Sequence, residues 1–207
     1  GDWSSDVCSS DLFKAAAMGI PFIPVRDHGG SDMELVNRGK MIECPFTGKN
    51  VYLLPACHPD VGIIHTTAAD MYGNARIFGA HCTCPEIAMA AATATIMTTE
   101  KIISTENIRS YPNLTEIPYP VVDTVTEQPF GSYPGASYGF SWFDMDHLRM
   151  FRSLCEDFRK TGNKEALKKY YDEYIFSCET FDDFLEKVGY KTLKKLKDLD
   201  GGQPIII

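Results

Sequence analysis

The sequence lacks a long hydrophobic run, an excess of positive charge and a closely paired set of cysteines. Its longest apolar stretch, Ile87–Met97, is rich in Ala and Thr and is far shorter than the roughly 20 residues that a membrane-spanning helix needs. The net charge of -8 provides no long-range attraction to phosphate backbones, so nucleic acid is not an expected partner. We therefore expect a soluble protein that binds neither membranes nor nucleic acid.

The seven cysteines are scattered along the chain. In a chain without a recognisable secretory signal, such scatter is typical of reduced thiols and predicts a cytoplasmic protein. His81, Cys82 and Cys84, together with Cys57 and His58, are the candidate zinc ligands. Structural zinc sites usually carry a paired C-x-x-C motif, which is missing here, so we predict no bound metal.

The first twelve residues differ in character from those that follow. Residues 2–12, DWSSDVCSSDL, are small, polar and acidic without periodicity, whereas the helical sequence FKAAAMG follows at once. Back-translated, these residues resemble a common sequencing adapter that has been read through in frame. We predict that residues 1–12 are such an artefact and that the native sequence starts, truncated, at Phe13. A disordered native tail is the alternative.

Beyond Phe13, short strand patterns alternate with helical patterns, which predicts an α/β fold with an open, mostly parallel sheet. A helix is expected at Phe13–Met18, closed by Gly19, and another runs from Pro85 to Met97 because that stretch is small and apolar on all sides. The turn sequence PFTGKN joins two of the predicted strands into a hairpin. Strands are predicted at 20–25, 41–44, 51–54, 62–67, 101–104 and 120–125, and C-terminal helices at 146–159, 164–177, 180–188 and 191–199.

Two other features belong to the last half of the chain. The loop QPFGSYPGASYGF is rich in Pro, Gly and aromatic residues and is expected to be packed rather than mobile. The lysines of the final helices alternate with apolar residues at helical spacing, which indicates solvated helix faces.

Four segments carry a resemblance to a known family. GIPFIPVRDHGGSD, YLLPACHPDVGIIHTTAADMYGNARIFG, MTTEKIISTENIR and IPYPVVDTVTEQPFGSYPGASYG follow one another in this order. Together they resemble the alpha subunit of glutaconate-type class I CoA-transferases. The resemblance spans nearly everything after Leu12, and it depends on the order of the segments more than on any one of them.

The resemblance implies a three-layer α/β fold shared with ribose-5-phosphate isomerase, with residues 13–207 as the C-terminal portion of an alpha-subunit domain. Alpha and beta subunits of this family pair around one active site, so a beta-type subunit is the expected partner in a hetero-oligomer. The acyl-CoA thioester is attacked by a glutamate of the beta subunit, which forms a covalent intermediate. Coenzyme A is then a substrate, no permanently bound cofactor is expected, and this chain alone is expected to be inactive.

The remaining residues of such an alpha subunit would line the site and bind substrate. Arg26 follows a predicted strand, where a guanidinium can hold a carboxylate through two hydrogen bonds; a surface salt bridge is the alternative. The segment after it could donate hydrogen bonds to substrate or coenzyme A, or could serve only as a solvated turn. The predicted substrate-binding residues are Arg26, His28, Gly29, Gly30, Ser31 and Asn74.

Three carboxylates, Glu100, Asp123 and Glu127, are candidates for a nucleophile or a general acid within this chain. Strand ends and helix flanks carry such residues routinely, so we expect them to have structural roles. Two alternative functions stay open at this point. One is a hydrolase on the same fold that opens a cyclic CoA thioester, and the other is a sugar-phosphate sensing module of a transcriptional regulator.

Overall fold

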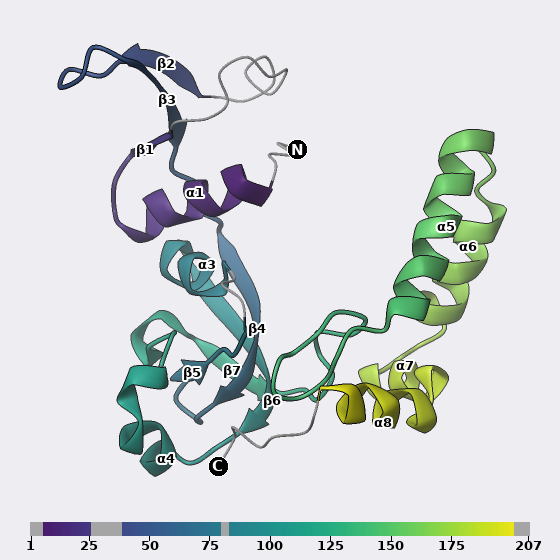
Figure 1. Ribbon diagram of the computed structural model, residues 1–207. Coiled ribbons are helices and arrows are strands. Elements are labelled where there is room, and N and C mark those ends of the chain that lie inside the picture. The colour runs from purple at the N-terminus through teal and green to yellow at the C-terminus, as the bar shows by residue number, and fades with distance from the viewer. Residues whose placement is uncertain (1–5, 26–38, 80–82, 201–207) are drawn as a thin grey trace. The chain divides into compact units, whose positions relative to one another are not determined.

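Figure 1 shows the protein as a computed structural model that describes residues 6–25, 39–79 and 83–200. The chain divides into two compact units, residues 1–128 and 129–207. Within the described ranges the first unit holds both sheets and the second is built mainly from helices. No helix in these ranges is long and apolar enough to cross a membrane.

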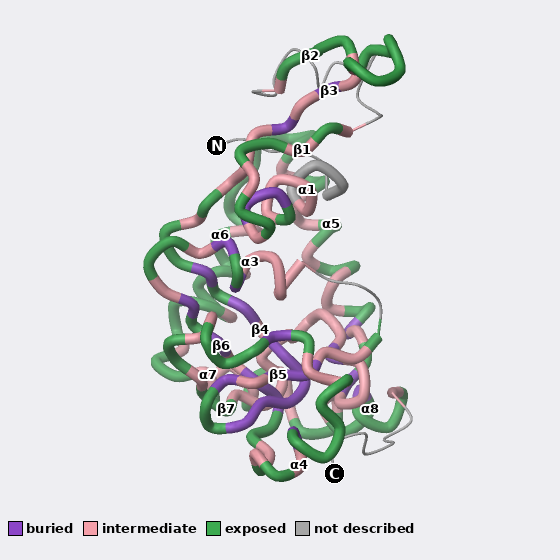
Figure 2. Tube along the Cα trace, turned by 90° about the vertical axis from the view of Figure 1, so that its left-hand side faces the viewer, coloured by how far each residue is buried: buried purple, intermediate pink, exposed green. Residues whose placement is uncertain are grey.

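The main sheet of the first unit has four strands in the order β5-β4-β6-β7. Strands β4 (Val61–Ala69), β6 (Ala94–Ile102) and β7 (Thr124–Glu127) run parallel, and the short edge strand β5 (Ala75–Arg76) is antiparallel to β4. The predicted α/β fold with a mostly parallel sheet is confirmed. Figure 2 shows that buried residues concentrate along β4, β5 and β6.

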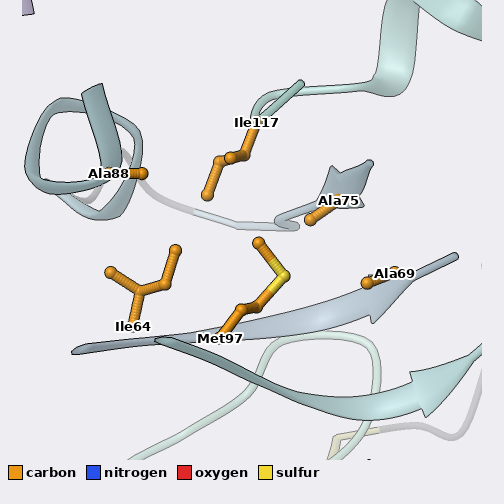
Figure 3. Packing of buried hydrophobic residues seen from close by; sticks show 6 residues of the cluster. All are labelled: Ile64, Ala69, Ala75, Ala88, Met97 and Ile117. Atoms are coloured by element: carbon orange, nitrogen blue, oxygen red, sulfur yellow. The ribbon is translucent and has the colours of Figure 1, made fainter. Parts of the chain in front are cut away.

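One face of this sheet packs against helix α3 (Cys84–Ala90). Ile64 of β4 and Met97 of β6 are register partners, and both are buried. Figure 3 shows their side chains pointing toward Ala88 of α3 and Ile117. Gly62 permits the close approach of the helix, because a Cβ there would lie 3.2 Å from Cγ2 of Ile87.

The expected helix Pro85–Met97 is wrong in its second half. Helix α3 ends at Ala90, and β6 begins at Ala94. The Ala residues favour a helix, but the following run TATIMTTE is rich in β-branched residues and forms a central strand that is buried on one face. The strand predicted at 101–104 is therefore only the end of β6, and Ser104 caps the next helix, α4 (Thr105–Ser110).

The strand predicted at 120–125 is displaced toward the C-terminus. Tyr119–Val121 forms a single 3₁₀ turn, η2, and β7 starts at Thr124. A second 3₁₀ turn, η1, spans Pro112–Leu114. Prolines fix φ and lack the N–H that a ladder needs, which accounts for the turns in this proline-containing segment.

A second, antiparallel sheet has the order β1-β3-β2. It consists of β1 (Phe22–Val25), β2 (Lys40–Glu43) and β3 (Asn50–Pro55). The predicted hairpin is confirmed as the β2–β3 pair. Strand β1 lies at the edge, as its prolines indicate, but its residues are exposed or half-buried rather than buried.

Helix α1 spans Asp6–Ala17 and confirms the helix predicted before Gly19. Gly19 has a φ of 68°, its N–H donates to Ala16 O, and Ile20 N–H donates to Ala15 O, which is a Schellman closure. The helix begins well before the predicted boundary at Phe13. The artefactual origin of residues 1–12 stays a prediction.

The second unit confirms the predicted C-terminal helices and the packed loop. Amphipathic spacing and good caps define the helices: Gly162 closes α5 in the left-handed conformation, and Thr180 forms a capping box with Asp183 at α7. In the loop, the rings of Phe130 and Phe140 are in contact and Lys197 lies over both. The elements are α5 (Met145–Thr161), α6 (Glu165–Tyr171), the π-helix η3 (Asp172–Phe176), α7 (Phe181–Val188) and α8 (Tyr190–Leu199).

Candidate functional site

The carboxyl ends of the parallel strands β4 and β6 meet at one edge of the main sheet. Strand β4 runs into a turn at Asp70–Asn74, and β6 runs into helix α4. Open α/β sheets bind ligands in the crevice beyond the carboxyl ends of their strands. A ligand site is therefore expected at this edge.

The turn after β4 is organised by the buried carboxylate of Asp70. Its Oδ1 accepts the backbone N–H groups of Tyr72 and Asn74, both at 3.0 Å, and its Oδ2 accepts the side-chain amide of Asn74 at 2.9 Å. Gly73 has a φ of 99°, and a Cβ there would lie 2.8 Å from Val122. The turn thus needs glycine for two reasons, backbone conformation and space.

Asn74, a predicted substrate-binding residue, joins this turn to a distant segment. Its Oδ1 accepts the backbone N–H of Tyr119 at 3.1 Å, while its amide donates to Asp70. Both polar ends of the side chain are therefore engaged within the protein. Direct substrate binding by Asn74 stays a prediction, and the observed contacts give it a positioning role.

A cleft of about 590 Å³ lies between the turn and helix α4. Among the described residues that line it, Arg109 is the only charged one. An adjoining recess of about 390 Å³ shares Tyr72, Thr105 and Arg109 with this cleft. The cleft is lined by Tyr72, Asn74, Thr105, Ile108, Arg109, Pro112, Thr115 and Tyr119.

Helix α4 is held in place by the buried Arg76. The guanidinium donates through Nη1 to Oδ1 of Asn107 at 2.9 Å and through Nη2 to the backbone carbonyl of Asn107 at 2.8 Å. Ser104 caps the same helix by accepting the N–H of Asn107 at 3.2 Å. Asn107 is thereby fixed at two points, two residues before Arg109.

The three carboxylates considered as nucleophiles have structural contacts. Glu100 is buried and lies 3.0 Å from Nε2 of His65. Oδ2 of Asp123 accepts the N–H of Thr95 at 2.7 Å, and Oε2 of Glu127 accepts the N–H of Ile102 at 2.6 Å. These contacts join neighbouring strands and agree with the structural roles expected for the three residues.

The other predicted substrate-binding residues all lie outside the part of the chain that the structure describes. They are Arg26, His28, Gly29, Gly30 and Ser31, and the zinc candidates His81 and Cys82 lie outside it as well. Among the residues that the structure does describe, no three His, Cys, Asp or Glu side chains are grouped to hold a metal ion. The absence of a metal stays a prediction.

Of the residues that line the cleft, sequence reasoning predicted Asn74 alone, and the most notable ones that it missed are Tyr72, Arg109 and Tyr119. Each lies inside or beside a segment that resembles the family, but none was singled out. More than thirty residues separate Tyr72 from Arg109, so no local spacing connects them. The only available signal was that each follows a strand pattern or a proline.

The second unit contains a separate polar network. The hydroxyl of Tyr133 donates to Oδ2 of Asp144 at 2.7 Å, and Nε2 of His147 lies 2.8 Å from the hydroxyl of Tyr170. Burial, with the hydrogen bond to Asp144, raises the pKa of Tyr133 far above its usual value. Burial lowers the pKa of His147, and the Asp144 carboxylate opposes this in part. The network thus favours a neutral His147 inside the helical unit.

Comparison with known families matches residues 9–128 to the family described as Coenzyme A transferase. A protein from Archaeoglobus fulgidus, described only as uncharacterized, is 43% identical over 91% of this chain and 41% of its own length. One of the subunits of the glutaconate CoA-transferase from Acidaminococcus fermentans is 32% identical over 97% of this chain and 65% of its own length. The chain therefore spans less than two thirds of each of these relatives.

The fold agrees with these similarities. The crystal structure of the glutaconate coenzyme A-transferase from Acidaminococcus fermentans matches with a TM-score of 0.82 and 31% identity, over 94% of this chain and 64% of that chain. A cholesterol ring-cleaving hydrolase subunit from Rhodococcus jostii is 30% identical over only 61% of this chain and 47% of its own length. The similarity to the transferase is thus the more extensive of the two.

Proposed function

We propose, because this chain belongs to the coenzyme A transferase family, that it is part of the alpha-type subunit of a heteromeric CoA-transferase. The enzyme would move coenzyme A between an acyl-CoA and a free carboxylic acid, with a dicarboxylate such as glutaconate as the substrate class. The observation that carries the proposal is similarity to a glutaconate CoA-transferase subunit along almost the whole chain, in sequence and in fold.

The proposed reaction is covalent and proceeds through the partner subunit. The thioester carbonyl is attacked by a glutamate carboxylate of the beta-type subunit, which forms a mixed anhydride and releases the coenzyme A thiolate. The thiolate attacks the glutamyl carbonyl, releases the first acid and leaves a glutamyl thioester. The acceptor carboxylate then repeats these two steps in reverse, which yields the new acyl-CoA and restores the glutamate.

The contacts of three carboxylates in the described part of this chain agree with a nucleophile on the partner. Glu100, Asp123 and Glu127 are each bonded to a neighbouring strand, and a carboxylate in such a bond is less available to attack a thioester. In this proposal Arg26 and the segment His28–Ser31 bind the acid or coenzyme A, and Asn74 positions the turn beside the cleft. Coenzyme A would be a substrate, with no cofactor held permanently, and the complex would work in the cytoplasm.

A complete gene that contains this reading frame, co-expressed with the reading frame beside it, provides the test. The purified complex should transfer a labelled coenzyme A from an acyl-CoA to a free dicarboxylate with ping-pong kinetics. Release of free acid in the absence of an acceptor would instead assign a thioester hydrolase. We expect that transfer is lost when the partner is omitted. Transfer by the alpha chain alone would contradict a nucleophile on the partner subunit.

Within the same complex, Arg26→Ala tests the acid-binding role. The variant should raise the KM of the acceptor acid or lower kcat while the complex stays assembled. Unchanged KM and kcat would show that Arg26 does not bind the acceptor acid.

A further inference from the structure

The helical unit carries three exposed apolar side chains that lie together on α6 and η3. Ile175 and Phe176 are 50% and 76% exposed, and Tyr171 is exposed as well. The ring centroids of Tyr171 and Phe176 lie 6.5 Å apart. We call Tyr171, Ile175 and Phe176 the aromatic stripe. A cluster of exposed apolar side chains of this kind marks a surface that contacts another protein.

The stripe depends on the change from α6 to the π-helix η3. In an α-helix, side chains five residues apart point about 140° away from each other, so Tyr171 and Phe176 would lie on different faces. The π-helical segment has a hydrogen bond from Ser177 N–H to Asp172 O, five residues back, and its wider turn brings the two rings together. Helices of this type are rare and are frequent at functional sites. The segment therefore adopts a rare conformation that places two aromatic rings in solvent.

The helical unit holds η3 in this conformation from two sides. On the side of α5, the ring of Tyr174 packs against His147, with 5.1 Å between the ring centroids. From α7, the ammonium of Lys187 donates to the backbone carbonyl of Glu173 and to the hydroxyl of Ser177. The stripe is thus fixed before a partner binds, which lowers the entropic cost of association.

Two exposed charged side chains flank the stripe symmetrically. Lys168 lies three residues before Tyr171, and Glu179 lies three residues after Phe176. Within the described ranges neither charged side chain has an ion-pair partner. A two-fold axis through the middle of the stripe would place Tyr171 of one copy on Phe176 of the other, and Lys168 beside Glu179. Contact of the stripe with itself is therefore complementary in charge as well as in apolar surface.

From this symmetry we propose that the aromatic stripe is a contact between two copies of this chain, so that its assembly contains at least two of them. An isologous contact repeats every pair, so the stripe would supply two aromatic pairs and two ion pairs. A partner with a different sequence would not require opposite charges at equal distances from the centre. The proposal goes beyond the proposed function, because no step of the reaction enters it.

Sedimentation velocity of the complete chain, co-expressed with the reading frame beside it, tests the contact. Phe176→Ser should raise the dissociation constant of the pairing about tenfold or more, so that the mass halves at low concentration. Tyr190→Ser is the matched control, because Tyr190 is 77% exposed and lies outside the stripe. A Phe176→Ser complex with the same mass and dissociation constant as the control would overturn the proposal.

Charge reversal identifies the occupant and does not depend on the folding of the aromatic variant. Lys168→Glu and Glu179→Lys should each weaken the pairing about threefold or more, because each places like charges together, and the double variant should restore it. Restoration requires that both charges come from the same sequence. A double variant that pairs more weakly than either single variant would refute the contact between copies and assign the stripe to a different chain. The absence of transferase activity in these samples would refute the proposed function and leave the contact intact.

Discussion

Asn74 donates its side-chain amide to the buried carboxylate of Asp70 at 2.9 Å. The same side chain accepts the Tyr119 N–H at 3.1 Å, so one residue connects the turn after β4 with the segment before β7. The sequence predicts Asn74 as a site residue. In the structure its hydrogen bonds connect the two segments that line the cleft. A residue can serve a site in this way without contacting the ligand.

Asn74→Ala should destabilise the first unit by about 1–3 kcal/mol, since it leaves Asp70 short of one donor and the Tyr119 N–H without its acceptor. Hydrogen exchange gives a local readout, because the Tyr119 amide should exchange faster in the variant. Asn113→Ala is the control, as Asn113 is exposed and makes no described side-chain hydrogen bond. Unchanged protection of the Tyr119 amide in Asn74→Ala would contradict the positioning role.

Gly73→Ala should cost more stability than Gly48→Ala, because only one of the two added methyl groups collides. Both glycines have positive φ, 99° and 66°, so both substitutions carry the strain of the left-handed region, about 1–2 kcal/mol. A Cβ at Gly73 would lie 2.8 Å from Val122, whereas the nearest atom to a Cβ at Gly48 is 3.8 Å away. Urea unfolding compares the two, and equal losses would mean that Val122 moves aside freely.

His65 lies between Thr98 and the fully buried Glu100, with ring nitrogens at 2.8 Å and 3.0 Å from their oxygens. His65→Leu removes one of the partners of a buried carboxyl group, and we expect a loss of about 1–3 kcal/mol. His58→Leu, at an exposed position, should change stability by no more than about 0.5 kcal/mol. A similar small effect at both positions in thermal unfolding would show that Glu100 does not depend on His65.

The helical unit was predictable from the sequence because its signals are local. Thr180 and Asp183 form a capping box, and Gly162 ends a long amphipathic helix. The run from Ala94 to Met97 was wrongly predicted as a helix because Ala-rich composition favours a helix, whereas its position between β4 and β7 in the sheet makes it a strand. Tertiary context overrides propensity where the residues are small and the intrinsic preferences are weak.

The candidate site was only partly predictable for a related reason. Asn74 stands in a Gly-Asn turn that is visible in the sequence, but the cleft joins it to Arg109 and Tyr119 through the parallel pairing of β4 with β6. Local spacing does not reveal that Arg109 lacks a counter-ion among the described residues or that Arg76 fixes its helix. Such facts depend on which distant segments become neighbours.

The stability of the helical unit should fall as the pH drops below about 6.5, the ordinary pKa of histidine. Burial lowers the pKa of His147 in the folded protein, so the unfolded chain takes up a proton first and is favoured in acid. This contribution is fully present above the unfolded pKa and is lost as the pH falls toward the folded one. Tyr133, Tyr170 and Tyr174 pack around the ring, and the Tyr170 hydroxyl is hydrogen-bonded to its Nε2. The carboxylate of Asp144 acts in the opposite direction and offsets part of the lowering of the pKa.

His147→Gln isolates this effect, because glutamine can still bond to Tyr170 but does not titrate. Melting temperatures of the parent and the variant, measured by circular dichroism between pH 7.5 and 5.0, should converge as the pH falls. Protonated carboxylates add their own acid sensitivity, but they are common to both proteins and cancel in the difference. A constant difference across this range would mean that His147 keeps its ordinary pKa in the folded protein, and the helical unit would then owe its acid sensitivity to carboxylates alone.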